Sequence, residues 1–423
     1  MRDVAPQTKR SRLASRLSTG RLTPLLLAAG TILAGCGSGA PGQGAGPAGQ
    51  PEVRDSAGLA IVENGGLDVP FGVVPVHVAD LIPPDSALTA VPWGVAVDPA
   101  AGRIYLADAM GARVAVFDVS GAWIGDLGRE GDGPGEFRSA SAVFLDADGV
   151  LTVWDARRSV LSRWSPAGEH LGEEPAPIGY WGPGFALVAG DIVTVTADQD
   201  PPRGMIQRLV AVSAGGARTL HAAALEMGEI RMGGSSLPAP RVLAPSVVWA
   251  ARGGRLYVLR GPAYRVDVLE GGAPVASVRR AVAPIPVTRD MALESVASGP
   301  GPYARFMRRA GLSAEQILDM VGHVPEVSPV QAIAVDDAGR IWVSRTLNGI
   351  TPALVDVLGA DGSYLGTIES AGVPVGFVSD SLFLSLRLDA MGQSTVSLHR
   401  LRPSAGNARA SLSTGPSASV DRS

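Results

Sequence analysis

Short runs of β-forming residues, separated by turns rich in Gly and Asp, recur along this chain. The clearest copies span residues 95–108 and 143–155, and further copies span 187–196, 248–259, 333–344 and 377–386. Each copy has two apolar runs around a turn such as the one from Asp146 to Gly149, which is the pattern of a β-hairpin. The pattern predicts a repetitive all-β architecture.

A second hairpin follows most of these copies and doubles the number of strands in each unit. Its turns are predicted at Gly121, Gly168, Gly215-Gly216, Gly271-Gly272 and Asp361-Gly362, and the first three recur every 47 residues. Units of four strands with a period of ~40–50 residues are typical of propeller blades. The sequence therefore predicts a six-bladed β-propeller over residues 57–403.

The last unit lacks a fourth strand, because the chain becomes polar after the segment 395–401. An isolated β-forming run, residues 58–63, precedes the first unit. We expect this N-terminal strand to complete the last blade and close the ring, which removes the open edges of the sheets.

The repeats resemble those of NHL-repeat-type six-bladed β-propellers, especially the lipid-anchored bacterial members of that group. The stretch from Gly128 to Phe137, Gly-Arg-Glu-Gly-Asp-Gly-Pro-Gly-Glu-Phe, is similar to the loop that links two blades in that family. The resemblance covers residues 57–402. It implies the fold but no particular activity.

One segment, residues 287–329, interrupts the period with helical patterning. A short helix is expected at 302–309, and Ser313 and Gln316 form a capping-box pattern that opens a second helix at 314–321. Insertions in repeat folds lie in loops on one face, so the segment is a candidate lid. It is equally well explained as a surface excursion that packs on one blade.

The N-terminus has the pattern of a bacterial lipoprotein signal. Six basic residues precede an apolar run at 22–34, which is too short to span a bilayer as a helix. The run ends in Leu33-Ala-Gly-Cys36, which resembles a lipobox. We therefore predict a signal peptide at 1–35, lipidation of Cys36, a flexible tether at 36–56 and a disordered tail at 404–423.

This prediction places the protein in the cell envelope, on the periplasmic or outer-membrane side, with the membrane as a partner through the lipid on Cys36. The chain has one cysteine, so the thiol has no disulfide partner within the chain. Loss of residues 1–35 removes six basic groups and one acidic group from a net charge of −4 and leaves −9. Nucleic acid is therefore not expected as a partner. We expect a monomer.

The composition of the 423 residues excludes other classes. The chain is 46% hydrophobic and 18% charged, which is too apolar for a disordered protein. It contains 54 Gly and 33 Pro, which indicates many turns and disfavours a helical bundle. Lys9 lies in the signal, so the mature chain has no lysine for Schiff-base chemistry.

Candidate site residues follow from strand geometry. The turns between strands two and three of each blade and the links between blades lie on one face, around a channel mouth. The residues expected at this mouth are Asp108, Arg113, Arg129, Asp155, Arg157, Arg260, Tyr264, Arg345 and Asn348. Arginine predominates, so the mouth is predicted to bind an unknown protein or a polar or anionic small molecule. Alternatively, the aspartates cap their own turns and the arginines are solvated or paired with them.

Catalytic patterns are weak. The five histidines have no metal-ligand spacing, so a zinc site is not expected. The lactone hydrolases that the chain resembles hold calcium in the channel, and Asp108, Asp155 and Asn348 could contribute oxygen ligands. Trp93, Trp154, Trp164, Trp249 and Trp342 are expected to pack between blades. We expect binding or scaffolding and no cofactor, and a metal-dependent lactonase-like hydrolase or lyase is the alternative.

Overall fold

A computed structural model describes residues 50–84, 94–176, 184–200, 204–213, 215–232, 234–298, 311–388 and 394–404. These residues form eight sheets, of which six contain a blade of four antiparallel strands, numbered here along the chain. Blade 1 consists of β4 (Val95–Asp98), β5 (Arg103–Asp108), β6 (Arg113–Asp118) and β7 (Trp123–Leu127). Blade 2 consists of β8 (Ala140–Leu145), β9 (Leu151–Asp155), β10 (Val160–Trp164) and β11 (His170–Pro175). Blade 3 consists of β12 (Phe185–Val188), β13 (Asp191–Asp200), β14 (Gly204–Ser213) and β15 (Gly216–Leu225).

The other three blades repeat this order. Blade 4 consists of β18 (Trp249–Arg252), β19 (Arg255–Leu259), β20 (Arg265–Glu270) and β21 (Ala273–Arg280). Blade 5 consists of β24 (Val330–Val335), β25 (Ile341–Thr346), β26 (Pro352–Leu358) and β27 (Tyr364–Glu369). Blade 6 consists of β28 (Val373–Ser379), β29 (Leu382–Leu388), β30 (Ser394–Pro403) and β3 (Val73–Asp80). The six repeats and the second-hairpin turns predicted from the sequence are confirmed.

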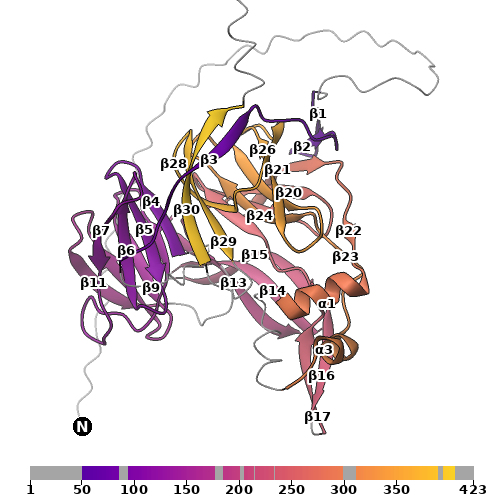
Figure 1. Ribbon diagram of the computed structural model, residues 1–423, viewed down its shortest axis with the longest axis horizontal. Coiled ribbons are helices and arrows are strands. Elements are labelled where there is room, and N and C mark those ends of the chain that lie inside the picture. Colours follow the sequence, from indigo (N-terminus) through magenta and orange to yellow (C-terminus); the bar gives the residue numbers. More distant parts are fainter. Residues whose placement is uncertain are drawn as a thin grey trace, which may run out of the picture. The chain divides into compact units, whose positions relative to one another are not determined.

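The blades form a closed ring (Figure 1). The first strands contact one another in the cycle β4, β8, β12, β18, β24, β28 and back to β4. Each pair of neighbouring blades shares an apolar cluster; for example, Trp342 packs among Val355, Val357 and Phe377 between blades 5 and 6. Trp154 and Trp164 are buried as expected, whereas Trp249 is partly buried. The expectation for Trp93 falls outside the described residues.

The prediction of the closing strand is wrong in its residues. The run at 58–63 does not lie on blade 6: β2 (Leu59–Asn64) pairs in parallel with β21 of blade 4, and β1 (Glu52–Ser56) covers its outer edge. The strand that completes blade 6 is β3, which pairs antiparallel with β30. Figure 1 shows β3 in indigo beside β30 in yellow. The strand β3 can fill this position because it ends at Asp80, and a single connection then leads to β4 of blade 1, which begins at Val95.

The N-terminal segment 52–80 crosses three blades, and we call it the strap. After β2 on blade 4, it reaches blade 5, where Phe71 donates a backbone hydrogen bond to Thr367 O (3.0 Å) and Thr367 donates one to Val69 O (2.7 Å). Asn64 fixes the crossing, since its Nδ2 donates to Gly362 O (2.9 Å). The strap then enters blade 6 as β3, so closure of the ring depends on a segment held by two other blades.

The fourth strand of every blade contains a β-bulge. The register of each fourth strand shifts by one residue against the third strand, and the extra residue is apolar in all six cases: Ile124, Leu171, Leu220, Val275, Leu365 and Val78. A bulge interrupts the regular pairing and increases local twist. The repetition shows that the fourth strand of each blade has the same irregularity, which sequence analysis missed.

The helical insertion packs with a neighbouring link, and its Met291 side chain also lies against Gly349 of blade 5. Helix α3 (Ala314–Val321) begins with the predicted capping box of Ser313 and Gln316. Its residues Ile317, Leu318 and Val321 are buried against β16 (Met227–Met232), which pairs with β17 (Ser235–Pro240). The expected helix at 302–309 falls outside the described residues.

Helix α1 (Arg289–Ser298) and the short pair of β22 (Ile285–Pro286) and β23 (Glu326–Val327) complete this unit, which we call the side subdomain. Figure 1 shows the two helices beside β16 and β17. Gly228 allows α3 to approach, because a Cβ there would collide with the Val321 carbonyl. No helix within the described residues has the length and apolar character needed to cross a membrane.

Candidate functional site

The first strands of all six blades enclose a central channel of about 780 Å³. Its wall is built mainly from aliphatic and aromatic side chains, with small residues such as Ala186, Ala250, Ala332 and Gly376. First strands are apolar because they contact both neighbouring blades and the channel. Pockets of about 300–1,000 Å³ are typical of small-molecule sites, so the channel has the size of a binding site.

The polar residues of the channel wall are engaged in local contacts. Asp146 accepts hydrogen bonds from the backbone N–H groups of Asp148 and Val150, both at 2.9 Å. Arg252 forms an ion pair with Asp337. Gln331 Nε2 donates to Ile350 O at 2.9 Å. These groups serve turns and blade contacts. The exposed surface of the wall as a whole is polar and apolar in similar measure.

The predicted mouth residues of blades 1 and 2 act within their own turns. Asp108 is 1% exposed and accepts hydrogen bonds from the N–H groups of Met110 (3.3 Å) and Gly111 (2.9 Å). Arg113 lies beside it, with its Nε 3.8 Å from Asp108 Oδ2, and also pairs with Asp126 at 2.7 Å. This geometry supports the interpretation that turn aspartates are structural.

Asp155 has the same position in blade 2 and holds two loops together. Its carboxylate accepts backbone hydrogen bonds from Arg138 (2.7 Å), Ser139 (3.1 Å), Arg157 (3.1 Å) and Arg158 (3.1 Å). The first two donors belong to the link from blade 1, and the last two belong to the turn of blade 2. The buried carboxylate therefore joins the blades, while the Arg157 side chain extends on the exposed surface.

Arg129 lies in the link that resembles the family loop. Its guanidinium pairs with Glu136 at 2.8 Å and is 81% exposed. The backbone N–H of Gly133 and the Arg129 guanidinium lower the pKa of the Glu136 carboxyl. Phe137 ends the link and is fully buried, and a Cβ at Gly128 would collide with its ring. The link is thus held by its own contacts.

Of the blade 4 candidates, Arg260 is engaged and Tyr264 is buried. Arg260 Nε lies 2.9 Å from Asp267 Oδ2, and its Nη1 contacts His221 Nδ1. Burial, together with the positive charge of Arg260, lowers the pKa of His221 to about 4. Tyr264 is 2% exposed, and burial raises the pKa of its hydroxyl.

The structure brings together two of the predicted residues, Tyr264 and Arg345, through residues that sequence analysis missed. Arg280 lies between them: its guanidinium is 5.9 Å from the Tyr264 ring centroid, and its Nη1 is 2.6 Å from Asp356 Oδ2. Arg345 Nε reaches the same carboxylate oxygen at 3.1 Å.

Asp68 of the strap completes this cluster, since its Oδ1 lies 2.6 Å from Arg345 Nη2 and 3.1 Å from Arg280 Nη2. Burial opposes ionisation of Asp68, but the two arginines outweigh it and lower its pKa. We call the set Arg280, Arg345, Asp356 and Asp68 the buried ion cluster. The one sequence signal for it is Asp356, an acid inside the apolar run from Val355 to Leu358.

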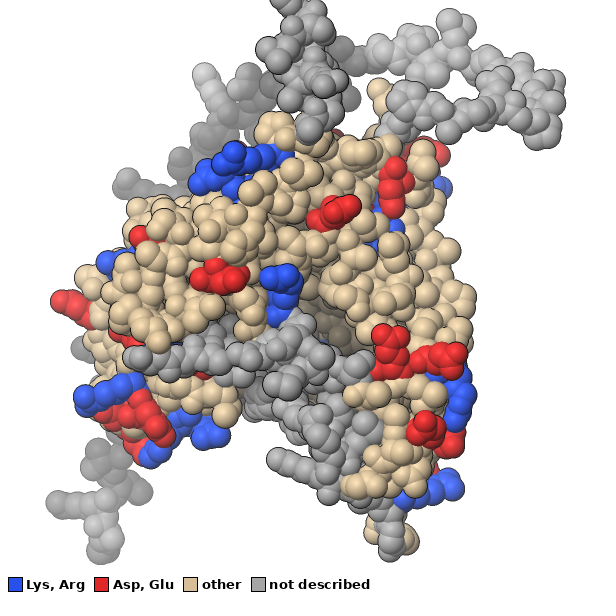
Figure 2. Space-filling view, viewed as in Figure 1, with Lys and Arg blue, Asp and Glu red and all other residues tan. Residues whose placement is uncertain are grey.

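Asn348 belongs to the same blade as Arg345 but works locally. Its Oδ1 accepts hydrogen bonds from Ile350 N (3.0 Å), Thr351 N (2.8 Å) and Thr346 Oγ1 (2.9 Å). Eight of the nine predicted residues therefore lie at or beside the connection between strands two and three of their blades, and Arg129 lies in a link between blades. Most of the nine contact residues of their own blade or link. Figure 2 shows acidic and basic side chains interspersed over one face of the molecule.

The residues expected to bind calcium do not fit that role. Calcium takes six to eight oxygen ligands, whereas the carboxylates of Asp108 and Asp155 and the amide oxygen of Asn348 accept hydrogen bonds within three separate turns. Within the described residues, no three His, Cys, Asp or Glu side chains are grouped as metal ligands would be.

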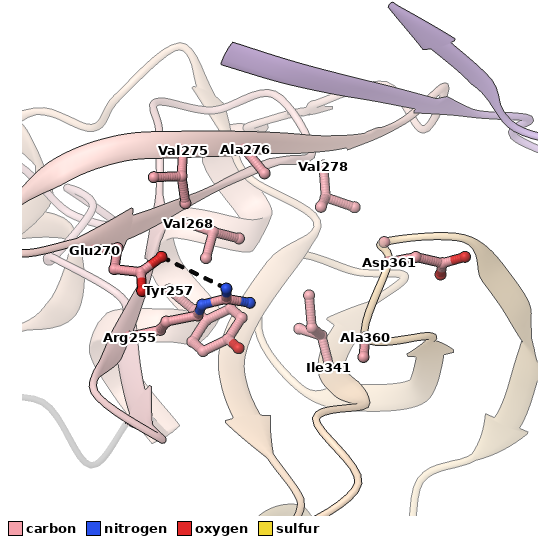
Figure 3. A pocket seen from close by; sticks show the side chains of 11 residues that line it. Arg255, Tyr257, Val268, Glu270, Val275, Ala276, Val278, Ile341, Ala360 and Asp361 are labelled. Carbon is pink, nitrogen blue, oxygen red and sulfur yellow. Dashed lines mark hydrogen bonds and ion pairs between the residues drawn. The ribbon is translucent and has the colours of Figure 1, made fainter. Parts of the chain in front are cut away.

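A second, smaller cavity of about 210 Å³ lies between blades 4 and 5 (Figure 3). Figure 3 shows Val268, Val275 and Val278 on one side and Ile341 on the other. Arg255 and Glu270 pair at 3.5 Å at its edge. The volume is below the usual range for ligand sites, so the central channel is the better candidate.

One comparison, with protein-family models, supports the fold. Residues 94–177 match a family described as a 6-bladed beta-propeller. No curated protein matches the chain.

Three solved structures illustrate the similarity. A putative exported protein from Bacteroides fragilis is 12% identical, with a TM-score of 0.45 over 81% of this chain and 99% of that one. A gluconolactonase from Xanthomonas campestris is 15% identical, with a TM-score of 0.37 over 80% and 98%. The calcium-binding protein regucalcin from Agrobacterium tumefaciens is 13% identical, with a TM-score of 0.40 over 77% and 95%. The strand order, the closed ring and the family match together identify the folded part of the chain as a six-bladed β-propeller.

Proposed function

We propose that the protein is a lipid-anchored, extracytoplasmic propeller that binds a ligand or a partner protein in the cell envelope. The anchor is Cys36, which lies outside the described residues. Support for it comes from the basic, apolar and lipobox-like order of residues 1–36. The first described strand, β1, begins at Glu52, so a short tether joins the lipid to the propeller.

The observation that carries the binding proposal is the central channel. It is large enough for a small molecule, and all six blades contribute to its wall. Alkyl and aromatic side chains bind by removing apolar surface from water, and they do not transfer protons. The mouth around the channel carries the exposed Arg129 and Arg157, which are the candidates for contact with a polar group or a partner. Binding therefore fits this geometry better than metal-dependent hydrolysis.

The anchor is tested with Cys36→Ser in cells fed an alkyne-tagged fatty acid. The unchanged protein should incorporate the tag and sediment with membranes, and the variant should incorporate none. Ser38→Ala is the matched control, because it alters a neighbouring residue of the tether and leaves the acceptor thiol. Tag incorporation by Cys36→Ser would overturn the anchor.

Binding is tested on the full chain extracted from native membranes with mild detergent. Native mass spectrometry should show a bound small molecule, or cross-linking in intact cells should capture one reproducible partner. An Arg129→Ala, Arg157→Ala double variant separates the two modes, because it should weaken a partner at the mouth and leave a ligand deep in the channel. A chain that carries neither ligand nor partner would contradict the proposed function.

A further inference from the structure

The strand pair that completes blade 6 places two histidines opposite each other. His77 of β3 is the register partner of His399 of β30, and the centroids of their rings lie 5.7 Å apart. β3 is the last strand of this sheet, where it pairs with β30 alone among the described strands. The strand that closes the ring is therefore held beside two side chains of the type that gains a positive charge in mild acid.

His399 is buried in a form that suits the neutral ring. The residue is 5% exposed, and its Nε2 lies 2.9 Å from Ser385 Oγ. The Ser385 hydroxyl donates its own hydrogen to Ala371 O (2.9 Å), so it accepts a hydrogen bond from the Nε2–H of His399. The other ring nitrogen, Nδ1, then carries no proton, and it is buried without a hydrogen-bond partner among the described residues.

Protonation of Nδ1 would create a charge that the surroundings do not compensate. The charged groups that act on the His399 ring are His77 and Arg387, which oppose a positive charge, and Asp80, which favours it. Asp80 Oδ1 is already engaged, since it lies 2.9 Å from His77 Nε2 and accepts a hydrogen bond from Ser397 Oγ at 2.6 Å. Burial and the two positive groups together lower the pKa of His399 to about 4.

The other neighbours of the His399 ring are aromatic. The ring stacks on Phe383 of β29, with centroids 5.4 Å apart. Phe383 belongs to the cluster that blades 5 and 6 share, in which its ring centroid lies 5.7 Å from that of Trp342. These rings provide no negative charge, so a proton on the buried imidazole costs free energy. Displacement of β3 would bring water to His399 and remove that cost.

We propose that β3 acts as an acid-sensitive latch, which leaves β30 when His399 takes up a proton and so loosens the closure of the ring. The inference does not rest on the proposed function. The strands β28, β29 and β30 follow one another in the chain, whereas β3 joins them from the strap, which blades 4 and 5 hold by separate contacts. Release of β3 therefore does not require those blades to unfold. Leu81, which follows β3, is buried between blades 6 and 1, so release also reaches that interface.

The test is hydrogen exchange of the full chain, measured at pH 7, 5.5 and 4 on peptides from β3 and from β9 and β10 of blade 2. Each exchange rate is divided by that of the unfolded peptide at the same pH, which removes the direct effect of pH on exchange. In the released state His399 has an ordinary pKa of about 6.5. Linkage then predicts that protection of β3 falls about a hundredfold between pH 7 and 4. Protection of β9 and β10 should be retained.

His399→Gln is the decisive variant, because it keeps a polar group beside Ser385 and does not take up a proton in this range. Its β3 should be protected equally at pH 7 and pH 4. His170→Gln is the matched control, since His170 is a partly buried histidine on the fourth strand of blade 2. This control should lose β3 protection in acid as the unchanged chain does.

A second variant guards against a folding defect in the first. The His77 side chain is 52% exposed, and His77→Gln removes a charge that opposes protonation of His399. Its loss of β3 protection between pH 7 and 4 should be smaller than that of the unchanged chain.

Three results would overturn the inference. The first is an equal loss of β3 protection in the two variants and the unchanged chain. The second is a loss in β9 and β10 together with β3, because the chain would then unfold as a whole and not release one strand. The third is full protection of β3 in the unchanged chain at pH 4.

Discussion

The channel wall and the junction of blades 4 and 5 differ in how they use charge. Among the described residues, the wall carries few charged side chains and encloses open space, whereas the junction holds the buried ion cluster, in which Arg280 and Asp356 have fully buried side chains. Sequence reasoning expected arginines to serve a ligand at the mouth. The structure instead engages most of them in contacts between strands and blades.

The difference teaches that charge in this propeller works mainly in assembly. The buried ion cluster ties Asp68 of the strap to two blades, so it fixes the position of the segment that closes the ring. Buried ion pairs are poor sources of net stability but costly to break, because one partner is left charged and unpaired. The junction should therefore be sensitive to mutation and the channel wall tolerant.

The largest effect should come from Asp356→Ala. The change leaves Arg280 and Arg345 without their shared buried carboxylate, and it should lower the free energy of unfolding by about 3–5 kcal/mol. Urea denaturation measures the change. Asp198→Ala, which removes an acid from an exposed pair with Arg208, is the control and should cost less than about 1 kcal/mol. Equal losses for the two variants would remove the contrast between buried and exposed charges.

A smaller loss is expected at the polar contact between blades 1 and 2. Asp155→Ala removes the acceptor of four backbone N–H groups. Each buried donor left unsatisfied costs about 1–3 kcal/mol, but water can reach some of these four. The free energy of unfolding should therefore fall by about 2–3 kcal/mol. Asp148→Ala, in an exposed turn of the same blade, is the matched control. Thermal unfolding of both variants measures the difference, and a loss below about 0.5 kcal/mol for Asp155→Ala would show that the carboxylate does not join the blades.

The closing blade should weaken in mild acid. Burial, with the charges of His77 and Arg387, lowers the pKa of His399 to about 4 against a partial opposing effect of Asp80. As the pH falls, the His399 side chain is therefore protonated in the unfolded chain before it is protonated in the folded chain. Stability is retained above about pH 6.5 and lost as the pH falls toward 4. At about 1.4 kcal/mol per pKa unit, the loss is on the order of 2–3 kcal/mol.

His399→Gln should reduce the loss of stability between pH 6.5 and 4, because it removes the titrating imidazole and keeps a polar group near Ser385. Denaturation at a series of pH values measures the slope. If the variant and the unchanged chain lose stability equally between pH 6.5 and 4, His399 is not the cause.

The smallest effect is expected at the exposed rim. Arg129→Ala breaks a pair with Glu136 that is open to solvent, and it should change stability by less than about 1 kcal/mol. Calorimetric unfolding measures it. A loss as large as that of Asp356→Ala would mean that the rim also depends on its charges, and it would weaken the comparison with the junction.

Much of the fold could be predicted because hairpins are local. Alternating apolar runs and the turns at Gly121, Gly168 and Gly362 identified strand pairs that are close in sequence. The closing strand was misplaced because 58–63 and β3 both have β-forming patterns, and only long-range pairing separates them. The hairpin β16–β17 was missed for a related reason, since its buried face contacts α3, about eighty residues later in the chain.

Less of the candidate site could be predicted. Strand order placed Asp108, Asp155 and Arg345 in equivalent loops, but it could not show which partners they have. The partners Arg280 and Asp68 lie far away in sequence, and their pairing depends on how the strap crosses the blades. The channel wall could not be predicted because the first strands are hydrophobic on both faces, which is also the pattern of ordinary core strands.

The origin of β3 has a consequence for how the molecule is made. This strand is synthesised before the first strand of blade 1, yet its partner β30, the last strand of the described residues, emerges more than three hundred residues later. Blade 6 thus combines the earliest strand of the propeller with a very late one. The ring can therefore close only after synthesis of nearly the whole polypeptide. Contacts of such long sequence separation slow folding, and a chain that stays incomplete until its end emerges is suited to passage through a membrane before it becomes compact.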